Sequence, residues 1–146
     1  MVQSRLELIA RDIAQTLSPS QARAVALLAV RAVASLLPAD PVVQEVVAAI
    51  ERGDWRAAQT RCAPLEPIAV RLDEHYLQLH HSEGEQNTPG VIDAFSRARA
   101  LDTLVIVLGP DETMAAKEAV YEAHAALGEI HGERLLAQVR SIIGTA

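Results

Sequence analysis

Histidine and carboxylate side chains are the residue types through which this chain could do chemistry, and three of its five histidines lie in one short stretch. That stretch, DEHYLQLHHSEGE, covers residues 73–85 and adds four carboxylates to the three imidazoles. Such side chains bind zinc, iron or manganese when at least three of them converge. One hypothesis is therefore a metal site that uses nearby glutamates and the five histidines: His75, His80, His81, His124 and His131.

The spacing inside residues 73–85 argues against a metal site on a single helix. Two ligands on a helix share a face when they are three or four residues apart. The residues at those distances after positions 73–75 are a tyrosine, two leucines and a glutamine. The pairs with suitable spacing involve Glu83 and Glu85, where the helix runs into Gly84. We therefore interpret these histidines as a helix C-terminus, where a protonated imidazole faces the negative end of the helix dipole.

The other two histidines lie in a second acidic region near the C-terminus. His124 and His131 are seven residues apart, which places them on one face of a continuous helix. Four glutamates mark another face: Glu118, Glu122, Glu129 and Glu133. We interpret the region as a solvated acidic stripe beside a half-buried edge; the alternative is that His124 or His131 meets His75 or a carboxylate around a metal. The Glu-x-x-His spacing of ferritin-like di-iron proteins is absent, which argues against that class.

Gly128 and Gly132 are four residues apart in this region and lower its helix propensity by about 2 kcal/mol relative to alanine. That cost indicates a packing reason or a break. We expect close packing against another helix of the same chain. The alternatives are contact with a helix of a partner or second copy, and a break into two helices.

No familiar catalytic arrangement is present in the sequence. There is no glycine-rich phosphate loop, Cys-x-x-Cys, His-Glu-x-x-His or Gly-x-Ser-x-Gly. The one cysteine, Cys62, has no histidine beside it and is expected to be a buried, inert thiol. Arg23 and Arg31 are expected to extend their charged ends to solvent or to pair with acids of a later helix, with binding of a small anion as the alternative. Trp55 is expected to be a core anchor, with contact to a partner as the alternative. We therefore expect no catalytic residues and no cofactor.

The elements that must position these residues are predicted to be helices. The hydrophobic half of the chain is mostly alanine, valine and leucine, and 3% of the residues are aromatic. Alanine is the best helix former, whereas strands favour aromatic and β-branched residues. The best strand candidate, TLVIVL, continues an upstream apolar pattern of helical spacing. We predict one all-α domain over residues 1–146, an antiparallel helical bundle or helical-hairpin stack of six to seven helices.

Capping residues and prolines predict the helix boundaries. Ser18, Asp40 and Thr88 each precede a proline, and Asp54 follows Gly53, so all four are expected to cap a helix. Pro67 is expected to open the fifth helix. The residues between 82 and 90 are polar and are predicted to form a mobile loop. The predicted helices cover residues 6–17, 19–37, 41–53, 55–63, 67–81, 89–108 and 111–143, the last being one helix or two broken near Gly128.

Charge and hydropathy limit the kinds of partner. Residues 1–62 carry seven arginines and six acids, whereas residues 63–146 carry six basic residues and thirteen acids. The net charge is therefore +1 in the first part and −7 in the second, which disfavours binding to nucleic acid. The most apolar stretch, ALLAVRAVASLL, contains Arg31 and is too short to span a bilayer. We expect neither a nucleic-acid nor a membrane partner.

The function predicted from these observations is a non-catalytic helical module for protein–protein interaction. An acidic helical protein suits a basic partner, either as an adaptor or as an immunity-type inhibitor. The predicted contact residues are Glu118, Glu122, Glu129, Glu133 and Trp55. The alternatives are a metal-binding helical bundle, which could be an enzyme, and a structural homodimer that meets through Gly128 and Gly132 or Trp55. One cysteine and a charged N-terminal segment favour a cytoplasmic location.

Overall fold

A computed structural model of the chain describes residues 4–82 and 88–144. Within those ranges the structure has seven α-helices, one short 3-10 helix and no strand, which confirms the predicted all-α fold. The helices are α1 (Arg5–Thr16), α2 (Pro19–Val33), η1 (Ala34–Leu36), α3 (Pro41–Glu51), α4 (Trp55–Arg61), α5 (Leu65–Ser82), α6 (Pro89–Ile106) and α7 (Glu112–Ile143).

Side chains cap the helices at most of the predicted positions. At the start of α2 the Ser18 hydroxyl accepts a hydrogen bond from the Gln21 backbone N–H, and the Gln21 side chain accepts one from the Ser18 backbone N–H. Four other helices begin with a side-chain cap, made by Ser4, Asp54, Thr88 and Asp111. Asp40 is the exception: it caps nothing and instead pairs with Arg71 of α5 at 3.3 Å.

Several predicted boundaries differ from the structure. The second helix ends at Val33, and residues 34–36 continue as a 3-10 turn rather than as α-helix. Helix α5 begins two residues before Pro67, since proline is tolerated in the first turn of a helix, where its missing N–H has no partner. The loop predicted over 82–90 is shorter, because Ser82 ends α5 and Pro89 begins α6. Its residues 83–87 lie outside the described part of the chain.

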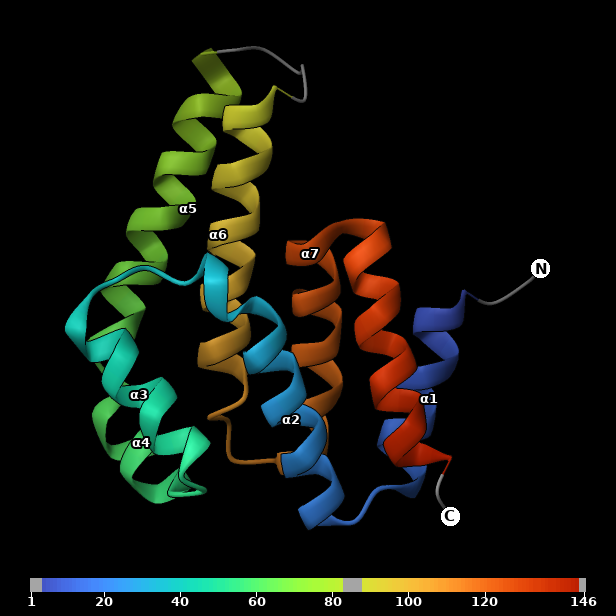
Figure 1. Cartoon of the computed structure of the whole chain (residues 1–146). Helices are drawn as coiled ribbons and strands as arrows, with labels where there is room; N and C mark the ends of the chain where they lie inside the picture. Colours follow the sequence, from blue (N-terminus) through green and yellow to red (C-terminus); the bar gives the residue numbers. More distant parts are fainter. Residues whose placement is uncertain (1–3, 83–87, 145–146) are drawn as a thin grey trace.

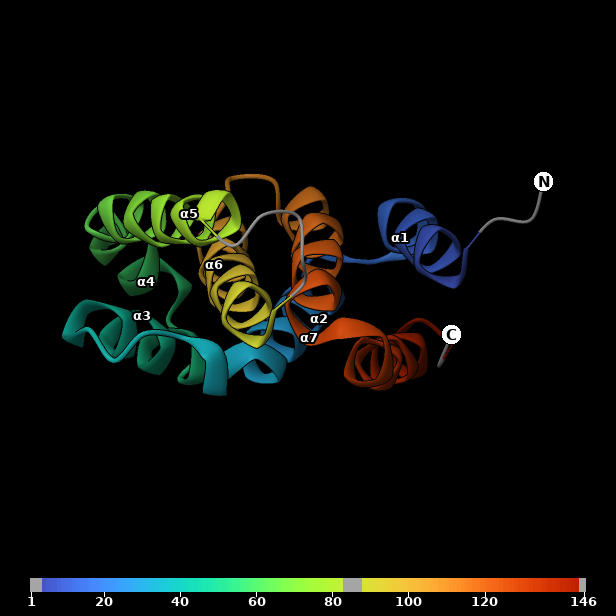
Figure 2. The ribbon, with the colours of Figure 1, turned by 90° about the horizontal axis from the view of Figure 1, so that it is seen from above.

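The helices form three adjoining groups (Figures 1 and 2). Helices α2, α6 and the first part of α7 lie at the centre, α3, α4 and α5 lie on one side, and α1 and the last part of α7 lie on the other. The central position of α2 agrees with its apolar sequence, and the largest buried side chains of the core include Val30, Leu101, Leu104 and Leu136. No helix in the described ranges is long and apolar enough to cross a membrane.

Helix α7 folds back on itself at Gly128. This residue has φ 79° and ψ 178°, a conformation that breaks the helix and that glycine alone adopts readily. Figure 1 shows the two limbs, residues 112–127 and 129–143, side by side. A Cβ atom placed on Gly132 would lie 2.6 Å from Cδ2 of His124, so the absence of a side chain there permits this close approach. The helix break at Gly128 and the close packing at Gly132, which were alternatives in the sequence, therefore both occur.

Helices α5 and α6 form a hairpin whose outer half projects beyond the rest of the bundle (Figure 1). We call this outer half, residues 74–82 and 89–97, the arm. Within the described ranges, the helix against which α5 packs extensively is α6 alone. Its buried residues are accordingly confined to Leu65 and Ile68, near its first turn. The arm is thus a two-helix projection with side chains open to solvent on several sides.

Candidate interaction site

The structure distributes the five histidines over three helical segments. His75, His80 and His81 lie on α5, whereas His124 and His131 lie on different limbs of α7. The Tyr76 and His80 rings stack with centroids 5.8 Å apart. No group of three or more His, Cys, Asp or Glu side chains within the described ranges is placed to hold a metal ion. The interpretation as a helix C-terminus is confirmed for His80 and His81, which lie in the last turn of α5, but not for His75, which lies about two turns before the end of the helix.

The four glutamates of α7 do not form one stripe, because the reversal at Gly128 separates them into two pairs. Glu122 approaches the Arg99 Nη1 with its Oε2 at 3.4 Å. Glu133 lies 3.4 Å from Arg5 Nη1 and 3.8 Å from His124 Nε2. Glu118 and Glu129 are exposed. The prediction that His124 and His131 share a face is wrong for the same reason, since the spacing rule requires a continuous helix.

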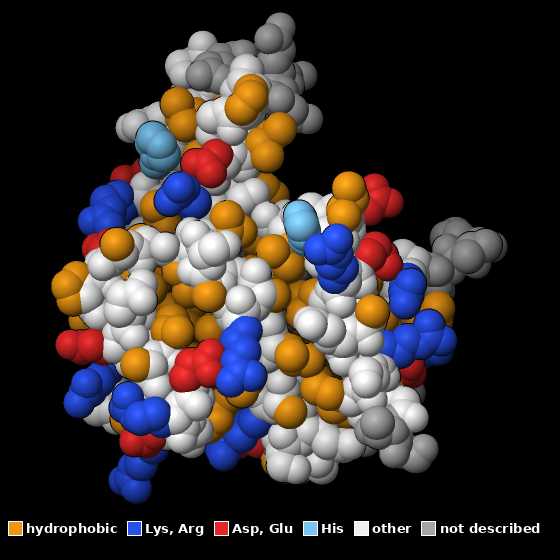
Figure 3. Space-filling view, in the orientation of Figure 1, with side chains coloured by type: hydrophobic (Ala, Val, Ile, Leu, Met, Phe, Trp, Pro, Cys, Tyr) orange, Lys and Arg blue, Asp and Glu red, His pale blue; other side chains and the backbone are white. Residues whose placement is uncertain are grey.

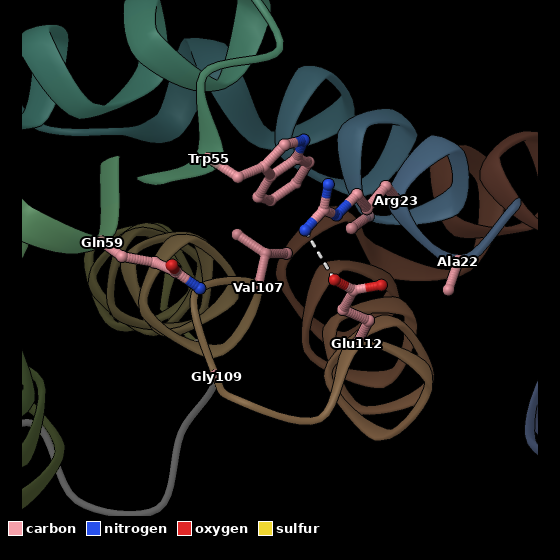
Figure 4. Close-up of a pocket in the computed structure, with 8 residues that line it drawn as sticks. Ala22, Arg23, Trp55, Gln59, Val107, Gly109 and Glu112 are labelled. Carbon is pink, nitrogen blue, oxygen red and sulfur yellow. Dashed lines mark hydrogen bonds and ion pairs between the residues drawn. The ribbon is translucent and has the colours of Figure 1, made fainter. Parts of the chain in front are cut away.

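Trp55 is half-buried and packs against the core, as expected for an anchor. Figure 4 shows the Arg23 guanidinium between the indole ring and Glu112. It lies 5.9 Å from the ring centroid and donates a 2.6 Å hydrogen bond to Glu112 Oε1, which confirms its predicted pairing with a later helix. The adjoining cavity measures about 10 Å³, close to the space that one water needs. This contact therefore joins α2, α4 and α7 and leaves no room for a ligand.

A cluster of charged side chains at the base of the arm joins α5, α6 and α7. Arg99 Nη2 lies 3.0 Å from Asp73 Oδ1 and 2.9 Å from Asp102 Oδ2, and its Nη1 reaches Glu122. The guanidinium also lies 5.6 Å from the Phe95 ring centroid. Its Nε–H is buried and has no hydrogen-bond acceptor among the described residues. One cation thus faces three carboxylates, and the Arg99 cluster (Asp73, Arg99, Asp102 and Glu122) has a formal charge of −2.

The carboxyl of Asp102 is the titratable group most affected by this arrangement. Partial burial raises its pKa to about 6, and repulsion from Asp73 and Glu122 acts in the same direction. Attraction to Arg99 opposes the rise but does not cancel it. A carboxyl in such surroundings favours its neutral form. The charge of the Arg99 cluster is therefore sensitive to pH in the mildly acidic range.

Replacing Asp102 with asparagine is expected to stabilise the protein above pH 7. The folded protein holds the Asp102 proton to a higher pH than the unfolded chain does. The stability that protonated Asp102 contributes is therefore fully present below the pKa of this group in the unfolded chain, and it is lost as the pH rises through about 6. Asparagine cannot ionise and avoids that loss. We expect Asp102→Asn to raise the free energy of unfolding at pH 7.5 by about 1 kcal/mol. Urea denaturation at pH 4.5 and 7.5 measures the effect, and an equal change at both pH values would contradict it.

A hollow on the arm adjoins the Arg99 cluster. Its walls are the side chains of Tyr76, Val91, Ile92 and Phe95, and its volume is about 340 Å³. The Tyr76 and Phe95 rings pack with centroids 5.5 Å apart and an interplanar angle of 60°. Because Phe95 lines the hollow and also contacts Arg99, the apolar hollow and the charged cluster meet at the Phe95 ring.

Comparison with protein-family models, with curated proteins and with solved structures finds no significant match. The function must therefore be inferred from the residues of this chain. The sequence prediction missed the Arg99 cluster. The spacing of Arg99 and Asp102 is a visible helical signal, but Asp73 and Glu122 lie 26 and 23 residues from Arg99, and only the packing of three helices brings them together.

Proposed function

We propose that the chain is a non-catalytic protein–protein interaction module and that its arm contacts a basic partner. The observation that supports this proposal is the one-sided packing of α5, whose outer half has α6 as its main neighbour. Large apolar side chains on the arm remain open to water, with Leu77 50% and Ile92 51% exposed. Exposed apolar side chains gathered on a projecting element are typical of interaction surfaces. Figure 3 shows hydrophobic side chains at the surface of this projection.

The charge of the α5–α6 hairpin supports a basic partner. Residues 65–106 contain seven acids and three arginines, which gives −4 of the total formal charge of −6. Complementary charge accelerates the association of a basic partner with the hairpin and disfavours the binding of acidic proteins. Of the acids predicted to contact a partner, Glu118 and Glu129 keep exposed side chains, while Glu122 and Glu133 contact basic residues of the chain itself. We further propose a cytoplasmic location, which the single free cysteine supports.

Removing apolar surface from the arm is expected to abolish partner capture. The arm variant carries Leu77→Ser with Ile92→Ser, and the control carries Met114→Ser with Ile130→Ser, two exposed positions on α7. Neither variant changes the net charge. In affinity capture from a lysate of the source organism, we expect the wild type and the control to retain the same protein. We expect the arm variant to lose at least about 90% of it, corresponding to more than 1.4 kcal/mol of binding energy.

The salt dependence of capture tests the charge of the partner. Binding through complementary charge weakens as salt is added, since screening shortens the range of the interaction. We expect recovery to fall between about 50 and about 300 mM salt, and the retained protein to be basic. A partner retained equally by the arm variant, or the absence of any partner at low salt, would contradict the proposal.

A further inference from the structure

We infer that the arm hollow receives the apolar face of a basic amphipathic helix of the partner, with a lysine or arginine of that helix placed at the Arg99 cluster. This inference rests on the proposed function and specifies the chemistry of its contact. It follows from the shape of the hollow, from its continuity with the carboxylates and from the sign of their charge.

The hollow is built to accept an aliphatic or aromatic side chain. Its inner wall includes Val91, which is buried, and its rim includes Ile92, which is half-exposed. Tyr76 and Phe95 come from the two different helices of the arm, and their rings contact each other in the wall of the hollow. A volume of about 340 Å³ exceeds that of one large apolar side chain, so the hollow can hold two neighbouring side chains of a ligand.

The hollow and the Arg99 cluster lie along one face of α6. Ile92, Phe95, Arg99 and Asp102 follow each other at intervals of three or four residues, which is the spacing of a single helix face. On α5, Asp73 and Tyr76 are three residues apart and meet Arg99 and Phe95 respectively. From Ile92 to Asp102 the face extends about 15 Å. A partner helix of about three turns would match that length.

The charge at the base of this face selects a cation. Arg99 neutralises one of the three carboxylates that surround it, so two negative charges remain uncompensated within the cluster. A lysine or arginine placed there would relieve the repulsion among Asp73, Asp102 and Glu122. A helix with apolar residues on one face and basic residues two turns away can fill the hollow and pair with the carboxylates at the same time. A purely apolar segment cannot pair with the carboxylates, and an acidic segment is repelled by them.

A synthetic peptide tests this inference directly on the full chain. The probe is a leucine–lysine peptide of about 14 residues whose leucines repeat at helical spacing. Its control has the same composition with the leucines alternating, which disfavours an amphipathic helix. Fluorescence anisotropy of the labelled peptides gives the dissociation constants. We expect the helical probe to bind the wild type at least about tenfold more tightly than the alternating control does.

Two pairs of protein variants locate the contact. Ile92→Ser is expected to raise the dissociation constant of the helical probe about tenfold. Ile130→Ser, which makes the same replacement at a more exposed position on α7 (74% against 51%), is expected to leave it unchanged. Asp73→Asn is expected to raise the dissociation constant of the helical probe about threefold and to reduce its salt dependence. Glu45→Gln, which removes the same charge from an exposed position on α3, is expected to leave the dissociation constant and its salt dependence nearly unchanged. Thermal melting of each variant establishes that it is folded.

The outcomes separate this inference from the proposed function. Equal binding by the Ile92 and Ile130 variants, or by the two peptides, would mean general attraction to an acidic protein and would overturn the inference. A second result would also overturn the inference: the chain associates with itself, Ile92→Ser abolishes this association, and the probe does not compete with it. The hollow would then be assigned to a second copy of the chain. If such results accompany loss of the natural partner by the arm variant, the proposed function stands and only the hollow is misassigned.

Discussion

Arg99→Met is expected to lower the free energy of unfolding by about 2–3 kcal/mol at pH 7.5. The side chain of Arg99 is 27% exposed, and its guanidinium is the positive charge shared by Asp73, Asp102 and Glu122. Methionine keeps most of the apolar stem but leaves three carboxylates facing one another. Removing one member of a partly buried ionic cluster costs more than the pairs contribute, because the remaining charges are left without compensation. Urea denaturation of the wild type and the variant gives the difference.

The neighbouring Arg97 provides a matched control for this substitution. It pairs with Asp93 at 2.9 Å on the exposed surface of the same helix. An exposed pair contributes little, so Arg97→Met is expected to change stability by less than about 0.5 kcal/mol. Attraction to Arg99 is what opposes the raised pKa of Asp102, so the folded variant holds the Asp102 proton to a still higher pH than the unfolded chain does. The deficit of Arg99→Met should therefore grow from pH 5 to pH 8. Equal losses in the two variants, or a deficit independent of pH, would refute this account of the Arg99 cluster.

Gly128→Ala is expected to cost about 1–3 kcal/mol of stability. Gly128 has φ 79° and ψ 178°, a region that residues with a Cβ atom occupy only under strain. Apart from Gly128, its two chain neighbours and the nearby backbone of α7, no atom of a described residue lies within 4 Å of the position that a new Cβ would take, so the cost is conformational and does not arise from a clash. The alternative for the variant is to continue the helix through position 128, which would remove the second limb of α7 from its place in the core. Thermal and urea unfolding measure the loss.

Gly90 is the matched control for the conformational argument. It lies in the first turn of α6 with a negative φ, and outside its own helix no atom of the described part of the chain lies within 4 Å of its Cβ position. Alanine has the higher helix propensity, so Gly90→Ala is expected to leave stability unchanged or to raise it by up to about 1 kcal/mol. Gel filtration should also detect any dimer formed by exchange of the second limb in Gly128→Ala. A Gly128→Ala protein that is as stable as Gly90→Ala and remains monomeric would contradict the requirement for glycine at the reversal.

Local chemistry was sufficient to predict the helices and most of their starting points. Ser18 and Thr88 cap helices where the sequence indicated, since a hydroxyl followed by proline satisfies the first free backbone N–H groups regardless of the rest of the chain. The difference at Asp40 shows the limit of that reasoning. Its carboxylate could accept hydrogen bonds from the local backbone or from Arg71, which is 31 residues away. The tertiary structure brings the arginine within hydrogen-bonding distance.

The candidate site was predictable only in part, because it depends on which helices meet. The acidic character of the second half follows from the sequence, but the choice of α7 glutamates as one contact face assumed a continuous helix. The two glycines indicated either a helix break or a close approach of another segment. The structure has both, because Gly128 breaks the helix and His124 packs closely against Gly132. Once the helix reverses, Glu122 points to Arg99 while Glu133 lies near Arg5.

The sequence by itself determined that this protein is helical, where most of its helices begin, and that its second half is acidic. Those properties depend on backbone propensity, capping and composition, which act over a few residues. The tertiary structure decided that α5 and α6 project as an arm, that Arg99 collects three carboxylates from three helices, and that an apolar hollow adjoins them. Residues 23–26 positions apart become neighbours through helix packing, and no local pattern in the sequence specifies which helix faces meet.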